Sequence, residues 1–314
     1  RKLQSGDWFV VLSGARDGHQ FIPIAAEKRC GGVIAQRVPK HWDRGFIKVD
    51  SGLAALQAIA KERRSRYDGP VIGITGSAGK TTTRALIACA LQALGDIHQT
   101  AGNFNNHIGL PLTITNAAKN RGAWVLEMGM NAPGEIALLQ DIARPTVRLI
   151  TNIGAAHVEG CGSIEGVAKA KGELFEGAQP SDICCINQDD QRVAEQPLPP
   201  GIIRWSYGCS AGVDVQMLEA NLIPDRLSTE VRLSTPVGPI AFTLPAPGRH
   251  LAHNAMAAVT VALALGLSPA QIIRGIERYE PVGDRLRPIS IGPVSVINDA
   301  YNANPMSMIA SLEL

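Results

Sequence analysis

The sequence predicts an α/β protein in which a small N-terminal α/β unit precedes a larger, doubly wound domain with a mostly parallel sheet. Three observations predict this fold. Strand-like and helix-like segments alternate between residues 70 and 187, which is typical of a parallel sheet with helices on both faces. A glycine-rich loop joins the first of these strands to the first of these helices. The 314 residues also exceed what one hydrophobic core usually organises, so we expect two domains.

Residues 1–68 form the expected N-terminal unit. DWFVVL and GGVIAQ have the composition of strands, SGARDGH that of a turn, and LAALQAIAKERR that of an amphipathic helix. The basic cluster KERRSR at 61–66 should end this helix and face solvent, its charges favoured by the helix dipole. Asp68-Gly69-Pro70 marks the boundary.

Residues 69–297 form the expected central domain. Its predicted strands are PVIGIT, WVLEMGM, VRLITNIG and DICCIN, and its predicted helices are KTTTRALIACALQAL, GEIALLQDIA and residues 163–177. A β-rich, hairpin-like region is expected from 202 to 244, then helices near 250–265 and 269–279 and a strand at PVSVIND.

Charge and cysteine content exclude several classes of protein. The net charge of +2, from 30 basic and 28 acidic residues, is too even for a nucleic-acid or membrane surface. The six cysteines have no CxxC spacing and suggest neither a disulfide framework nor a zinc site, which fits a reducing, cytoplasmic compartment. The apolar stretch AMAAVTVALALGL at 255–267 is too short to span a bilayer and predicts a buried helix.

The loop TGSAGKTTT at 75–83 predicts a phosphate-binding site. Gly76 and Gly79 allow backbone N–H groups to turn inward, Lys80 would reach the β- and γ-phosphates, and the Thr81 hydroxyl would ligate Mg²⁺. Ile74 departs from the general pattern, which requires a small residue there. The alternative is a glycine-rich turn without a ligand.

Three further features follow predicted strands. Glu127 ends WVLE at the carboxyl edge of the sheet, where it could share Mg²⁺ with Thr81. His157, in TNIGAAHVEG, is either structural or a ligand of a second divalent ion. In GNFNNHIGLPLT the asparagines suit a polar substrate clamp or turn chemistry; they are Asn103, Asn105 and Asn106.

These segments, in order along the chain, resemble the Mur ligase superfamily, and within it the MurF family. The segments that carry the resemblance are TGSAGKTTT, GNFNNHIGLPLT, LEMGMNAPGEI, TNIGAAHVEG, VAKAKGELF and NDAYNANPMSM. The resemblance implies ATP and Mg²⁺ as cofactors, and UDP-N-acetylmuramoyl-tripeptide and D-Ala-D-Ala as the molecules joined through an acyl phosphate. It also implies a monomer.

The resemblance implies roles for individual residues. Lys80, His157 and Lys171 would be catalytic; Lys171 matches the lysine that these ligases carry as a carbamate, and Lys169 is the nearby alternative. The implied metal ligands are Thr81, Glu127, His157 and Lys171. The implied nucleotide contacts are Thr75, Gly76, Ser77, Gly79, Lys80, Thr81, Thr82, Asn254, Arg285 and Asp299.

Two places depart from the family pattern. Gly283-Asp284 precedes Arg285 where the family has Lys-Gly, and the loop before Asp17-Gly18-His19 is one residue short. The N-terminal unit still resembles a UDP-binding domain, with substrate contacts at Ser13, Gly18 and His19. His250 and His253 could suggest a metal pair, but two ligands alone do not make a site.

Residues 298–314 are expected to be a hinge and the start of a third domain that this chain lacks, so we expect it to turn over poorly or not at all. Two alternatives stay open. One is another ligase of this superfamily, similar to MurE or to folylpolyglutamate synthase. The other is a nucleotide-binding module without catalysis.

Overall fold

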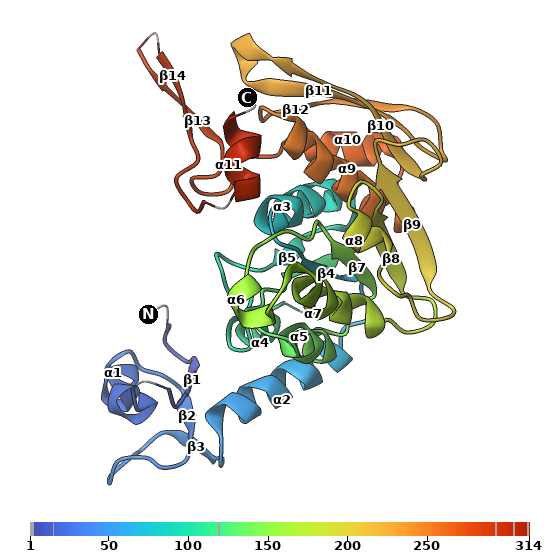
Figure 1. Ribbon diagram of the computed structural model, residues 1–314. Coiled ribbons are helices and arrows are strands. Elements are labelled where there is room, and N and C mark those ends of the chain that lie inside the picture. Colours follow the sequence, from blue (N-terminus) through green and yellow to red (C-terminus); the bar gives the residue numbers. More distant parts are fainter. Residues whose placement is uncertain (1–2, 15, 119, 293, 304, 313) are drawn as a thin grey trace.

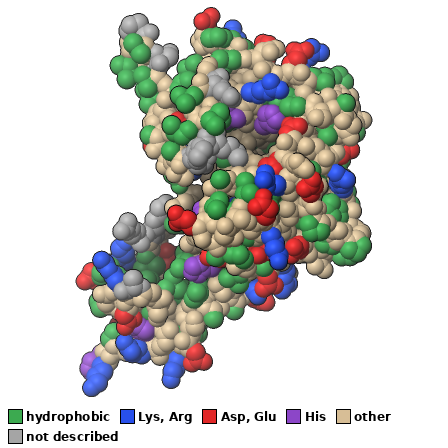
Figure 2. All heavy atoms as spheres, viewed as in Figure 1, with side chains coloured by type: hydrophobic (Ala, Val, Ile, Leu, Met, Phe, Trp, Pro, Cys, Tyr) green, Lys and Arg blue, Asp and Glu red, His purple; other side chains and the backbone are tan. Residues whose placement is uncertain are grey.

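The structure, a computed structural model, describes residues 3–14, 16–118, 120–292, 294–303, 305–312 and 314. A small N-terminal unit, a layered central body and a C-terminal hairpin with a helix follow one another along the chain (Figure 1). The central body contains a mostly parallel sheet covered by helices, which confirms the predicted fold class. Positive and negative side chains are interspersed on the face in Figure 2, as the even charge balance predicts.

The N-terminal unit is built on a parallel sheet in the order β1-β2-β3. Val11, Ile22 and Val33 are buried between this sheet and the short helices. The elements of the unit are β1 Trp8–Val10, η1 Gly18–Phe21, α1 Ile22–Glu27, β2 Gly32–Ala35, β3 Gly45–Lys48 and α2 Gly52–Ser65.

The basic cluster at the end of α2 does not simply face solvent, and that expectation was wrong. Arg63 and Arg64 are half-buried and donate hydrogen bonds to carbonyl oxygens of the central body. Arg64 Nε is 2.7 Å from the Ala143 oxygen, and Arg64 Nη2 is 2.7 Å from the Arg144 oxygen. These guanidinium groups satisfy carbonyls at the ends of other segments, so they fasten α2 to the central body.

The central sheet has nine strands in the order β12-β11-β10-β9-β8-β7-β4-β6-β5. Neighbours from β5 to β10 run parallel, and β10, β11 and β12 are antiparallel. The region 202–244 is therefore hairpin-like only from β10 onward, because β9 continues the parallel part. The strands are β4 Val71–Thr75, β5 Ile97–Gln99, β6 Ala123–Glu127, β7 Val147–Ile150, β8 Ile183–Asn187, β9 Ile203–Gly208, β10 Val215–Ile223, β11 Ser228–Ser234 and β12 Ile240–Leu244.

Helices cover both faces of this sheet. One hydrophobic cluster joins the sheet to α3, α9 and α10, and a second joins it to α2, α4, α5 and α7. The helices of the central body are α3 Lys80–Ala90, η2 Gln92–Leu94, α4 Gly109–Thr115, α5 Glu135–Ala143, α6 Val158–Cys161, α7 Ile164–Glu176, α8 Gln191–Ala194, η3 Pro224–Arg226, α9 Arg249–Ala264 and α10 Pro269–Ile276.

The predicted buried helix is α9, whose apolar residues from Ala255 to Leu263 are buried. Within the part of the chain that the structure describes, no helix combines the length and apolar character needed to cross a membrane. The C-terminal elements are β13 Arg287–Ile291, paired antiparallel with β14 Val294–Asn298, and α11 Pro305–Leu312, which lies close to α3 in Figure 1.

Arg148 on β7 is buried, and its hydrogen bonds connect the sheet to α7. Its guanidinium donates to the carbonyl oxygens of Leu174 and Gly177, both at 2.9 Å, and to Asp182 Oδ2 at 3.0 Å. We expect Arg148→Met to lower the free energy of unfolding by about 3–5 kcal/mol, because it removes the cation paired with the Asp182 carboxylate and the donor to the Leu174 carbonyl. Urea unfolding measures this loss. Arg204→Met, at an exposed position of β9, is the control and should change it by less than about 0.5 kcal/mol.

Candidate active site

The glycine loop connects buried β4 to the N-terminus of α3, as the sequence predicts. Gly76 has φ of 151°, and Gly79, the N-cap of α3, has φ of 77°. A side chain at Gly76 would lie 1.9 Å from Thr151 Oγ1, so the loop needs glycine for space as well as for conformation. The N–H groups of the first turn of α3 have no intrahelical acceptor and are directed out of the helix end, where they favour an anion.

The segment after β7 holds this loop in place, a connection that sequence reasoning missed. Asn152 Oδ1 accepts the Ala78 N–H at 2.8 Å, and the Asn152 carbonyl accepts the Ser77 N–H at 3.0 Å. Thr151 Oγ1 donates to the Ala78 carbonyl at 2.6 Å. In the sequence, Thr151 and Asn152 could be recognised only as part of the end of a predicted strand. Hydrogen bonds within the protein therefore hold the loop in place without a ligand.

Lys80 follows the loop as the first residue of α3. Its Nζ donates to the Gly76 carbonyl at 2.6 Å, so the side chain folds back over the loop. Burial lowers the pKa of Lys80, the Glu127 carboxylate raises it, and Arg285 lowers it again. An anion bound above the loop would favour the charged form of this lysine.

Glu127 lies at the end of β6 and is buried among donors. Thr81 Oγ1 donates to Glu127 Oε2 at 3.0 Å, and Asn105 Nδ2 donates to Glu127 Oε1 at 2.9 Å. A guanidinium nitrogen of Arg84 lies 3.8 Å from Glu127 Oε2. The structure thus brings together Thr81 and Glu127, which the sequence proposed as a metal-binding pair, and adds Asn105 to them.

Arg84 was not singled out from the sequence. It is 3% exposed and donates to the carbonyl oxygens of Thr100 and Gly102, which begin the asparagine loop. Burial is the main cause of its lowered pKa, and Glu127 opposes this shift. The sequence feature that could have identified Arg84 is its position four residues after Lys80, which places both on the same face of α3.

The three asparagines have different environments. Asn103 and Asn105 line the same cavity as Lys80 and Glu127. Asn106 instead accepts the N–H groups of Ile108 and Gly109 through Oδ1, at 3.1 and 2.8 Å, next to the start of α4. This is the turn chemistry that the sequence analysis gave as the alternative.

His157 and Lys171 belong to α6 and α7, and the charge of Lys80 acts on both of them. His157 is the exposed N-cap of α6 in a left-handed conformation, with φ of 65°. Burial, Lys171 and Lys80 lower the pKa of His157. Lys171 is only 1% exposed, and burial together with Lys80 lowers its pKa to about 7. Lys169, the alternative, is exposed.

A cavity of about 270 Å³ lies over the loop, and C-terminal residues form part of its wall. Arg285 lies 3.5 Å from the centroid of the Tyr301 ring, and Asp299 Oδ1 accepts the Leu286 N–H at 3.3 Å. Gly283 has φ of 63°, and Asp284 accepts a hydrogen bond from Asn298, so the departure from the family pattern is accommodated here. The candidate residues that line this cavity are Ser77, Gly79, Lys80, Thr81, Thr82, Asn103, Asn105, Glu127, Asn254, Arg285 and Asp299.

A second cavity, of about 220 Å³, shares Gly79, His250 and Asn254 with the first. Its remaining lining comes from α3, from α9 and from the carboxyl ends of β7, β8 and β9. Ligands bind at this edge of doubly wound sheets. An elongated ligand could therefore extend from one cavity into the other past Asn254.

The remaining candidates lie outside both linings, and they include Gly76, Asn106, His157 and Lys171. Thr75 is buried at the end of β4, directly before the loop. Ser13, Gly18 and His19 belong to the N-terminal unit, where Asp17 accepts hydrogen bonds from the His19 backbone at 3.0 Å and from Arg37 at 3.1 Å. In Figure 1 this unit lies at the opposite end of the molecule from α9.

The phosphate loop with the strand-end carboxylate beside it suits a nucleotide-dependent enzyme, and the comparison with known families identifies the class as ligases of the Mur type. Residues 74–262 match the Mur ligase middle domain.

Within that class, the chain belongs to the MurF family of UDP-N-acetylmuramoyl-tripeptide--D-alanyl-D-alanine ligases. The ligase of that name from Bacillus subtilis is 37% identical over 321 residues, which cover 100% of this chain and 68% of the relative. A crystal structure of MurF from Acinetobacter baumannii has a TM-score of 0.91 and 34% identity, and covers 100% of this chain and 69% of its own. MurF from Thermotoga maritima in complex with ADP has a TM-score of 0.87 and 30% identity, over 99% of this chain and 72% of its own. This family therefore uses ATP, and the alternative ligases considered from the sequence are not favoured.

Proposed function

We propose that this chain carries the ATP-dependent joining of D-Ala-D-Ala to UDP-N-acetylmuramoyl-tripeptide, a step in the synthesis of peptidoglycan precursors. The observation that carries the proposal is a match along 100% of the chain to a ligase with these substrates, at 37% identity. The Lys80–Thr81–Glu127 arrangement at the phosphate loop supports it. The reaction takes place in the cytoplasm, where ATP is available.

We assign a separate role to each of three successive segments of the chain. Residues 1–68 bind the UDP part of the substrate, with Ser13, Gly18 and His19 as contacts. Residues 69–297 bind ATP, and residues 298–314 form a hinge. Asn254 contacts the adenine, which fits its position between the two cavities. Asp299 contacts the ribose, and Arg285 approaches the phosphates.

The residues present fit a magnesium site. Thr81 and Glu127 offer a hydroxyl and a carboxylate 3.0 Å apart, and oxygen donors of this kind suit Mg²⁺. His157 and Lys171 complete the proposed ligand set, on condition that Lys171 is carbamylated. Bound magnesium supplies positive charge next to the phosphate oxygens.

Lysine carbamylation changes Lys171 from a cation into an anion. The neutral amine attacks the carbon of CO₂, an N–C bond forms, and one proton leaves to solvent. The lowered pKa of about 7 supports this step, because it keeps a substantial share of the amine neutral at physiological pH.

In the first chemical step, the terminal carboxylate of the tripeptide attacks the γ-phosphorus of ATP. The bond to the bridging oxygen breaks, and ADP and an acyl phosphate result. Lys80 donates to the phosphate oxygens, and the first-turn N–H groups of α3 stabilise the charge that gathers there. The loop is already held by Asn152 and Thr151, so little reorganisation is needed at this step.

In the second step, the amine of D-Ala-D-Ala attacks the acyl carbon. The tetrahedral intermediate expels inorganic phosphate, and the amine loses a proton as the amide forms. Asn103 and Asn105 line the cavity beside Glu127, where they would hold the reacting groups of the substrate. Exclusion of water protects the acyl phosphate from hydrolysis.

The test is phosphate release from ATP by a protein of the relatives' full length that contains this chain. UDP-N-acetylmuramoyl-tripeptide is present throughout, with D-Ala-D-Ala, with single amino acids, or with neither. We expect release that depends on the dipeptide. Release that requires a free amino acid instead would assign the chain to another Mur-type ligase, and no release with any amine would favour a nucleotide-binding module.

A further inference from the structure

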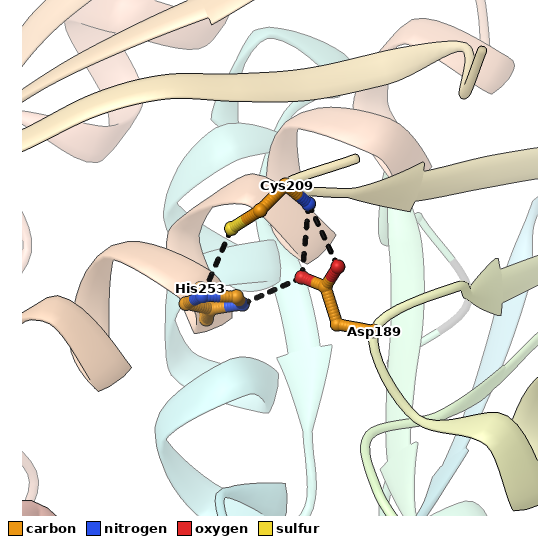
Figure 3. A group of neighbouring side chains, drawn as sticks. All are labelled: Asp189, Cys209 and His253. Atoms are coloured by element: carbon orange, nitrogen blue, oxygen red, sulfur yellow. Dashed lines mark hydrogen bonds and ion pairs between the residues drawn. The ribbon is translucent and has the colours of Figure 1, made fainter. Parts of the chain in front are cut away.

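Three side chains with metal-binding chemistry meet beside the second cavity (Figure 3). Asp189 follows β8, Cys209 follows β9, and His253 lies on α9. Cys209 Sγ lies 3.5 Å from His253 Nε2, and Asp189 Oδ2 lies 3.5 Å from His253 Nδ1. One ligand atom from each residue can be chosen so that all three lie within 4.8 Å of one another.

The separations fit a small ion with soft and borderline ligands. Zinc binds a thiolate at about 2.3 Å and imidazole nitrogen at about 2.0–2.1 Å, so a tetrahedral ion separates these two atoms by about 3.6 Å. The sulfur and nitrogen are already 3.5 Å apart, so they need almost no movement. The Asp189 carboxylate, whose side chain is 24% exposed, faces the other ring nitrogen, His253 Nδ1, so binding the ion requires it to turn toward Nε2. Water can take a fourth position.

The charges of the cluster also suit a divalent cation. A thiolate and a carboxylate together offset the two positive charges of zinc, while imidazole binds as a neutral ligand. Arg249 opposes the ion, since its Nη2 lies 3.9 Å from Cys209 Sγ. Arg249 is exposed, so its guanidinium can stay in water or donate to the thiolate from outside the ion's shell.

The other explanation of the cluster is a purely structural one. Both carboxylate oxygens of Asp189 accept the Cys209 N–H, at 2.8 and 3.0 Å, which ties the turn after β8 to the end of β9. That role accounts for Asp189. It does not require a thiol at position 209 or an imidazole at position 253. The Nε2 atom of that imidazole faces the thiol, and its Nδ1 atom faces the Asp189 carboxylate.

We propose that Asp189, Cys209 and His253 form a zinc site on the wall of the second cavity, separate from the magnesium ligands at Glu127. Binding releases the thiol proton to solvent and leaves three bonds from the ion to oxygen, sulfur and nitrogen. The ion would join the turn after β8, the end of β9 and helix α9. Because His253 lines the second cavity next to Asn254, the ion would also fix the wall of the proposed adenine site.

The test uses Co²⁺ as a spectroscopic substitute for zinc, because a cobalt–thiolate bond gives a charge-transfer absorption that oxygen and nitrogen ligands do not. Protein freed of metal with a chelator is titrated with Co²⁺, and the bound cobalt is then displaced with Zn²⁺. We expect one equivalent with the thiolate absorption. Cys209→Ser should abolish this absorption, and His253→Gln and Asp189→Asn should weaken zinc binding at least about tenfold.

Two matched variants locate the ion. Cys89→Ser removes a half-buried thiol of α3 that lies outside the cluster, and it should keep the thiolate absorption. Glu127→Gln removes a proposed magnesium ligand and should also keep the thiolate absorption. Circular dichroism of Cys209→Ser checks that the variant folds. Absence of the thiolate absorption in the parent protein, or its persistence in Cys209→Ser, would overturn the proposal.

Discussion

Replacing Lys80 by alanine is expected to slow phosphoryl transfer about a thousandfold, or about 4 kcal/mol of transition-state stabilisation. Lys80 is the cation that the loop directs over the proposed phosphate site, since its Nζ lies 2.6 Å from the Gly76 carbonyl. The measurement is the rate of ADP formation at saturating ATP and tripeptide substrate, in a protein of the relatives' full length.

Lys61→Ala is the control, because Lys61 pairs with Asp141 on the far side of the sheet and should leave the rate within about twofold. Lys80→Arg adds a second test. It keeps the charge but not the compact ammonium, so we expect it to recover only part of the lost rate. A Lys80→Ala protein with more than about a tenth of the parent rate would contradict this role.

Replacing Lys171 by methionine is expected to lower turnover about a hundredfold or more, because the protein then lacks both the amine and the carbamate proposed to form on it as a metal ligand. Methionine has a similar length and no charge, so it should be tolerated at this buried position of α7. Labelled bicarbonate and ¹³C NMR measure the carbamate directly and separately from activity.

The carbamate should depend on pH in a defined direction. The pKa of Lys171 is lowered from 10.5 to about 7, so its amine is mostly neutral above pH 7 and mostly protonated below it. We therefore expect the carbamate signal to disappear as the pH falls through about 7, rather than through the range of an ordinary lysine. Lys169→Met, at an exposed position of the same helix, should keep the signal. A signal that survives in Lys171→Met would exclude this residue as its source.

The fold was predictable where strands are long apolar runs. VIGIT, AWVLE and ICCIN are each almost entirely buried, and their order with the intervening helices determined the parallel sheet. The sequence did not reveal β5, whose three residues include His98 and Gln99, or the parallel pairing of β9 with β10. Short strands and strand direction depend on tertiary pairing that local composition does not encode.

The site was predictable where one segment carries the chemistry, as in the phosphate loop. It was not predictable where the partners come from distant segments. Asn152 reaches Ala78 across 74 residues, and Cys209 meets His253 across 44. The basic end of α2 was misjudged for the same reason, because its carbonyl partners lie 54 to 80 residues further along the chain.

Gly79 allows the phosphate loop to approach α9 closely at the boundary of the two cavities. An added Cβ at this glycine would lie 2.9 Å from Asn254 Oδ1, so the loop and α9 already stand as close as their backbone and amide allow. Gly79 and Asn254 both line the two cavities, so any side chain at position 79 would displace the Asn254 amide or the loop and would change the walls of both cavities together.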